Sequence, residues 1–135
     1  MIQAIIQPDL PVTAYRLSQA TLRRTFQISG TGMHTGEPCV VKVCPADEYT
    51  GILFQLGSDL VPARGSSVVN TRRASCIGTA SSRVDTVEHL MSALHGLQID
   101  NAVIKVDGPE IPILDGSALP WAEAIIAAGI EEQRA

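Results

Sequence analysis

The chain has 135 residues, 45% of them hydrophobic, which is enough for one domain with its own core but short for two. Its net charge of -4 and the mixing of acids with bases exclude the basic stripe of a nucleic-acid-binding protein. No segment approaches the ~20 apolar residues of a membrane span, and the start lacks the positive region of a signal peptide. Its three cysteines have no C-x-x-C spacing and suit a reducing compartment. We therefore expect a cytoplasmic protein with no nucleic acid partner and no transmembrane segment.

The first half of the chain is expected to be mostly β. Residues 1–20 show no sustained hydrophobic period and are predicted to form an arm outside the main fold. Apolar and polar residues roughly alternate over 21–28, which predicts a strand running into the glycine loop 30–36. Residues 39–44 and 51–56 are expected to be a pair of strands joined by a turn-rich segment. Shorter strand candidates follow at residues 60–63, 68–69 and 74–78.

The second half alternates helix and strand. A helix is predicted to begin near Asp85 and Thr86, where either side chain could cap it and Glu88 completes a capping box. Residues 102–106 have almost no polar face and predict a strand buried on both sides. A second helix is expected from about Ser117 to Gly129. This order predicts an α+β sandwich with both helices on one face of the sheet.

The segment Asp85-Thr86-Val87-Glu88-His89 contains the best candidates for a metal ligand and a general base. A neutral imidazole binds zinc, and a carboxylate one residue away can take a proton from an attacking water. On spacing alone, Glu88 is a first-turn acid favoured by the helix dipole and His89 an ordinary surface group, because one histidine is not a zinc site. His95 lies six residues further on, nearly opposite on the helix, and is expected to be a surface histidine.

Other candidates have a structural and a functional interpretation. His34 lies in a loop whose glycines allow positive φ or close approach to a ligand, although such loops are common turns. Arg72 and Arg73 could pair with phosphate or simply be solvated. Cys76 is expected to be a small residue in or near the core.

Several motifs together resemble the first domain of the zinc-dependent UDP-3-O-acyl-N-acetylglucosamine deacetylases of lipid A biosynthesis. They are GTGMHTG (30–36), NTRRASCIG (70–78) and DTVEHLMSALHGLQIDNAVIKVDGPEIPILDGSALPW (85–121). The resemblance covers about residues 20–130. Their order and spacing are specific in a way that T-V-E-H alone would not be.

The resemblance implies a fold, a metal and a reaction. The fold would be a ribosomal S5 domain 2-like two-layer sandwich: a mostly antiparallel or mixed sheet with two helices on one face, plus a small β insertion. Two such domains in the family hold a catalytic Zn²⁺ between them. Glu88 matches the general base and His89 the one zinc ligand of the first domain. His34 matches a histidine near the active site, and Cys76 a position near the metal. The reaction is hydrolysis of the substrate's N-acetyl group.

The resemblance also implies that this chain needs a partner. Its expected layout is an arm (1–20), deacetylase domain I (21–130) and the start of a linker (131–135) to an absent second domain. That domain, in the same or a separate chain, would supply the remaining zinc ligands and the proton donor, so the chain alone should be inactive. The alternatives are a non-catalytic module that binds a nucleotide sugar or a protein, and a self-associating pair whose metal site would differ from the family's.

Overall fold

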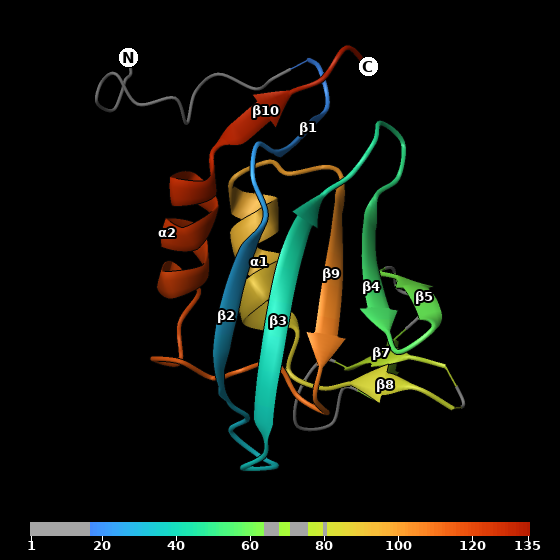
Figure 1. Ribbon diagram of the computed structural model, residues 1–135, viewed down its shortest axis with the longest axis vertical. Helices are drawn as coiled ribbons and strands as arrows, with labels where there is room; N and C mark the ends of the chain where they lie inside the picture. The colour runs from blue at the N-terminus through green and yellow to red at the C-terminus, as the bar shows by residue number, and fades with distance from the viewer. Residues whose placement is uncertain (1–16, 64–67, 71–75, 80) are drawn as a thin grey trace.

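The computed structural model describes residues 17–63, 68–70, 76–79 and 81–135, which form an α+β fold with a mixed sheet and two helices (Figure 1). The arm predicted at 1–20 therefore lies mostly outside the described residues, as do Arg72 and Arg73. The elements, in chain order, are β1 (Ala20–Leu22), β2 (Phe26–Thr31), β3 (Pro38–Pro45), β4 (Ile52–Leu56), β5 (Asp59–Pro62), β6 (Val68–Asn70), β7 (Cys76–Gly78), β8 (Arg83–Val84), α1 (Glu88–Gly96), β9 (Ala102–Asp107), α2 (Leu119–Ala128) and β10 (Ile130–Glu132).

The main sheet has five strands in the order β2-β3-β9-β4-β5. Strand β9 pairs antiparallel with β3 and parallel with β4, so it occupies the centre. Because side chains alternate along a strand, the sheet has two different faces. One face is apolar and fully buried, and it includes Val41, Val43, Phe54 and Ile104. The other carries a polar row across the strands, Gln27, Lys42, Lys105 and Gln55.

Both helices contribute buried side chains to one core. Helix α1 buries Leu90, Ala93 and Leu94, and α2 buries Trp121, Ile125 and Ala128. Figure 1 shows α1 behind the sheet with α2 beside it, and the two helices are in contact. A fully buried side chain of this size contributes ~1.5–3 kcal/mol, so this apolar layer dominates the stability of the fold.

Two smaller β units complete the structure. Strands β6, β7 and β8 form a three-stranded sheet, and β1 pairs antiparallel with β10. Buried Asn101 joins the second unit to the main sheet: its Oδ1 accepts the Gly51 N–H at 2.8 Å, and its Nδ2 donates to the side chains of Gln19 and Gln133.

Two of the strand predictions are wrong in their pairing or extent. The strand predicted over 21–28 is two strands, since β1 ends at Leu22 and pairs with β10, whereas β2 begins at Phe26 and pairs with β3. The segments 39–44 and 51–56 do form β3 and β4, but β9 lies between them. Strand β9 follows much later in the chain, yet it pairs with both β3 and β4 and separates them. The spacing of residues in the sequence does not show this long-range pairing.

The prediction that residues 102–106 are buried on both sides is also wrong. In β9, Ala102 and Ile104 are fully buried, whereas Val103 and Val106 are half-buried and Lys105 is exposed. The outer face of this strand belongs to the polar row and is open to solvent. The remaining strand predictions and the helix that ends before Gly129 (φ 91°) are confirmed where the structure describes them.

Candidate active site

Helix α1 begins without the expected cap. Its N-cap is Val87, and no side chain of the cap residue bonds to the first turn. Asp85 instead accepts two hydrogen bonds from the Arg83 guanidinium, at 2.8 and 3.0 Å. Thr86 donates its hydroxyl to the Glu110 carboxylate at 2.6 Å. The predicted capping box is therefore wrong, because a neighbouring arginine occupies one candidate cap and a distant carboxylate occupies the other.

Thr86 has a strained backbone. It is buried and has φ of 62°, in the left-handed region that a β-branched residue rarely adopts. Such a conformation costs about 1–3 kcal/mol and persists only where surrounding contacts hold it. The short bond to a buried carboxylate is such a contact, and it fixes the chain immediately before Glu88 and His89.

Glu88 and His89 lie half-buried in the first turn of α1. Hydrogen bonds from Ser117 lower the pKa of Asp115, and His89 adds to this shift, so the imidazole lies within electrostatic range of that carboxylate. Figure 1 places the start of α1, the start of α2 and the β2–β3 connection at the same end of the molecule. His95 is exposed, as expected.

His34 is held by a carboxylate that sequence reasoning missed. Its Nδ1 lies 3.0 Å from Glu110 Oε2, and its backbone N–H donates to Glu110 Oε1, also at 3.0 Å. The Thr35 N–H donates to the same Oε1 at 2.8 Å. Glu110 itself is 0% exposed, whereas a third of the His34 side chain reaches solvent. The loop is thus wrapped around a buried anion.

Glu110 is ionised although it is buried. Burial would raise its pKa, but the hydrogen bonds from Thr86, Thr35 and His34 outweigh burial and lower the pKa to about 2. Gly32 makes room for the carboxylate, since a Cβ there would lie 2.8 Å from Glu110 Cβ and closer still to Oε1. This glycine does not have positive φ, so close approach to a protein side chain explains it.

Two of the sequence motifs, the glycine loop 30–36 and the segment that begins at Asp85, meet at Glu110. Asp85 and residues 109–111 exchange backbone hydrogen bonds, from the Asp85 N–H to Pro109 and from the Ile111 N–H to Asp85, each 3.0 Å long. The Ile113 N–H donates to Thr31 at 3.0 Å, which ties the same segment to the histidine loop. The signal for Glu110 in the sequence is an acid set between apolar residues and prolines. The structure thus links His34 to the D-T-V-E-H segment through Glu110.

Cys76 is buried, at 3% exposure, as the sequence predicts. Burial, with a smaller contribution from Asp85, raises the pKa of its thiol to about 11, and Glu88 adds in the same direction. The Arg83 guanidinium lies 3.6 Å from the sulfur. The thiol is therefore protonated at neutral pH, whereas a metal ligand must be the thiolate.

The described residues do not make a complete metal site. The side chains that the structure describes are those of residues 17–63, 76–79 and 81–135. Among them, no three His, Cys, Asp or Glu side chains are grouped closely enough to hold an ion. A structural or catalytic zinc takes at least three protein ligands. His89 can therefore be one ligand of a site completed by other residues.

Neither helix in the described part of the chain is long and apolar enough to cross a bilayer.

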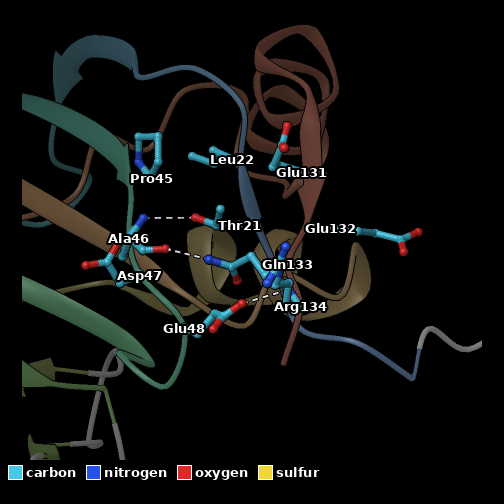
Figure 2. A pocket seen from close by; sticks show the side chains of 10 residues that line it. All are labelled: Thr21, Leu22, Pro45, Ala46, Asp47, Glu48, Glu131, Glu132, Gln133 and Arg134. Carbon is cyan, nitrogen blue, oxygen red and sulfur yellow. Dashed lines mark hydrogen bonds between the residues drawn. The ribbon is translucent and has the colours of Figure 1, made fainter.

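The other end of the molecule has a groove of about 460 Å³ that contains none of the candidate residues (Figure 2). Its walls are bonded to each other: the Ala46 N–H donates to Thr21 Oγ1, Gln133 donates to Ala46 O, and the Arg134 N–H donates to Glu48, all within 2.9 Å. These bonds join the β3–β4 connection to β1 and to the residues that follow β10. The groove therefore lies between segments that hold the fold together.

Comparison with known proteins places the chain in a family. The model of the family "LpxC: UDP-3-O-acyl N-acetylglycosamine deacetylase" matches residues 19–135. The chain is 47% identical to the UDP-3-O-acyl-N-acetylglucosamine deacetylase of Citrifermentans bemidjiense, over 84% of this chain and 38% of that protein. It is 46% identical to the Acidithiobacillus ferrooxidans deacetylase, over 88% of this chain and 40% of that protein. It is also 43% identical to the bifunctional enzyme LpxC/FabZ of Chlorobaculum tepidum, over 87% of this chain and 26% of that enzyme.

The chain spans less than half the length of these relatives, so it corresponds to one part of each. The matched region contains both segments that bond to Glu110, the glycine loop and Thr86, together with Glu88 and His89. The chain belongs to the UDP-3-O-acyl N-acetylglycosamine deacetylase (LpxC) family, a family of deacetylases.

Proposed function

We propose that this chain supplies one part of the active site of a zinc-dependent amidase that removes the N-acetyl group from UDP-3-O-acyl-N-acetylglucosamine in lipid A biosynthesis. Family membership over residues 19–135 carries the proposal, and the half-buried Glu88 and His89 supply suitable groups. A second deacetylase domain, in the same or a separate chain, completes the site, and this chain alone is inactive.

In this proposal the residues of the chain have separate roles. Glu88 is the general base, which takes a proton from the water that attacks the amide carbonyl carbon. The carbon–nitrogen bond then breaks, acetate leaves, and the second domain protonates the amine. His89 contributes one imidazole to the Zn²⁺ site. His34 contacts the substrate, and buried Cys76 shapes the wall beside Glu88.

The finer features of the fold and its surroundings belong to the same proposal. We infer that the fold is the ribosomal S5 domain 2-like two-layer sandwich, with residues 21–130 as the domain and 131–135 leading toward the second domain. The β6–β7–β8 sheet corresponds to the small insertion. All three cysteines are free thiols, which suits the cytoplasm.

Reconstitution tests the proposed function. Zinc binding and deacetylation are measured for this chain alone and mixed with a separately made second domain of the family. Activity is expected only in the mixture. Glu88→Ala should lower kcat on the order of 100-fold or more, because a general base contributes this much. His89→Ala should lower zinc affinity, whereas His95→Ala, on the exposed side of the same helix, should leave both unchanged.

The result that contradicts this proposal is a folded mixture in which Glu88→Ala and His89→Ala change neither activity nor zinc affinity. Binding of a nucleotide sugar that is insensitive to both substitutions would instead support a non-catalytic module.

A further inference from the structure

Glu110 accepts hydrogen bonds on both of its oxygens, which share one donor, the His34 backbone N–H at 3.2 Å from Oε2, and otherwise have different donors. Oε1 accepts the backbone N–H groups of His34 and Thr35, at 3.0 and 2.8 Å. Oε2 accepts the Thr86 hydroxyl at 2.6 Å and faces His34 Nδ1 at 3.0 Å. The backbone bonds hold the loop, so they would be enough for a purely structural role. The contact between Glu110 Oε2 and His34 Nδ1 is additional to these backbone bonds. It determines which ring nitrogen of His34 carries the proton.

An ionised carboxylate can only accept hydrogen bonds, so His34 Nδ1 must carry the proton that lies between them. The low pKa of Glu110, about 2, keeps the carboxylate in that form at neutral pH. Neutral His34 is then the Nδ1–H tautomer, and its Nε2 has a free lone pair. Nε2 points away from the buried carboxylate, on a side chain that is 34% exposed. The ring thus presents a hydrogen-bond acceptor outward.

We propose that Glu110 is a positioning residue: it fixes His34 in the Nδ1–H tautomer, so that Nε2 accepts a hydrogen bond from a hydroxyl or amide N–H of the sugar substrate. The inference rests on the proposed function for the identity of the substrate, but the tautomer does not depend on it. Glu110 also bonds Thr86, which precedes Glu88 in the chain, so the same carboxylate holds the histidine and the general base in one frame.

The tautomer of His34 is tested on the full chain. Long-range proton–nitrogen NMR spectra of the ¹⁵N-labelled protein are recorded at a pH high enough that its three imidazoles are neutral, with His34→Gln identifying the His34 signals. The wild type should show His34 with protonated Nδ1 and bare Nε2. Glu110→Gln should invert this pattern, because an amide NH₂ facing Nδ1 donates and leaves the proton on Nε2. Glu37→Gln, in the same loop and exposed, should change nothing.

A wild-type spectrum with the proton on Nε2 would overturn the proposal, and this measurement needs no variant to fold. An unchanged tautomer in folded Glu110→Gln would overturn it too. Both results are independent of activity, so they separate this inference from failure of the proposed function.

The catalytic part is tested in the reconstituted enzyme. Glu110→Gln should lower kcat/KM about 10- to 100-fold, the range for groups that orient a functional histidine. In the double variant with His34→Ala, the loss should be well below the product of the two single losses, because both changes remove the same contact between Glu110 and His34. Losses that multiply would show that Glu110 acts only through the fold, and would reject the positioning role.

Discussion

Glu110 is the only fully buried carboxylate among the described residues, and its charge is stabilised by hydrogen bonds from the loop and from Thr86. This has a consequence for acid stability. The folded-state pKa is about 2 and the ordinary value is 4.5, so the unfolded chain binds the proton more readily between these values. The contribution is complete above pH 4.5 and is lost as the pH falls toward 2. One pKa unit is 1.36 kcal/mol, so the total is on the order of 3 kcal/mol.

We therefore expect Glu110→Gln to lower the free energy of unfolding by up to ~3 kcal/mol at pH 7. The difference from wild type should shrink as the pH falls from 4.5 to 2, because the wild-type carboxylate becomes protonated there. Urea unfolding of both proteins across pH 2–7 measures it, and Glu37→Gln provides an exposed control. A difference that stays constant with pH would show that folding does not lower the pKa of Glu110.

At the scale of elements, α1 begins where a strained residue holds the chain. Thr86→Val keeps the strain at φ 62° but loses the hydroxyl bond to Glu110, so it should lower the free energy of unfolding by about 2 kcal/mol. Thr86→Gly loses the same bond but relieves the strain, and should cost about 1 kcal/mol less than valine. Denaturant titration of the two variants makes the comparison. If valine is tolerated as well as glycine, Thr86 stores no strain.

The same helix shows how far sequence reasoning reaches. The helix itself was predicted close to its observed position, because helix formation depends largely on residues that are near one another in the chain. The predicted cap was wrong because Thr86 donates its hydroxyl to Glu110, a residue 24 positions away, and not to the first turn of the helix. Equally, β3 and β4 were identified by composition, while the placement of β9 between them depends on long-range pairing.

For the whole molecule, His34, Glu88 and His89 were chosen from the sequence, partly through family resemblance, but the residue that joins their segments was not. In the sequence, Glu110 is one acid between two nearby prolines, and only its burial against Gly32 and Thr86 distinguishes it. A residue whose partners come from two distant segments, here the histidine loop and Thr86, has no local pattern. Such residues appear only when the chain is folded, and here one of them lies next to the candidate active site.

The exposed face of α2 leads to a prediction about assembly. Leu119 and Ile126 are 58% and 61% exposed and seven residues apart, so they lie on one side of α2, whose first turn is at the same end of the molecule as the start of α1. If a second domain covers this face, Leu119→Lys should weaken its binding about 10-fold or more, because the interface would have to desolvate a charge. Leu60, also 58% exposed, lies on β5 in the main sheet, so Leu60→Lys is the matched control and should have no effect.

Titration of the separately made second domain into each folded variant, followed by calorimetry, gives the two affinities. Equal losses in both variants would mean that added charge disturbs association without regard to position. No loss in either would show that the second domain does not pack over α2, and would move the search for its binding surface to the β2–β3 connection, where exposed Met33 precedes His34. A selective loss for Leu119→Lys would place the partner beside Glu88 and His89, where a completed zinc site requires it.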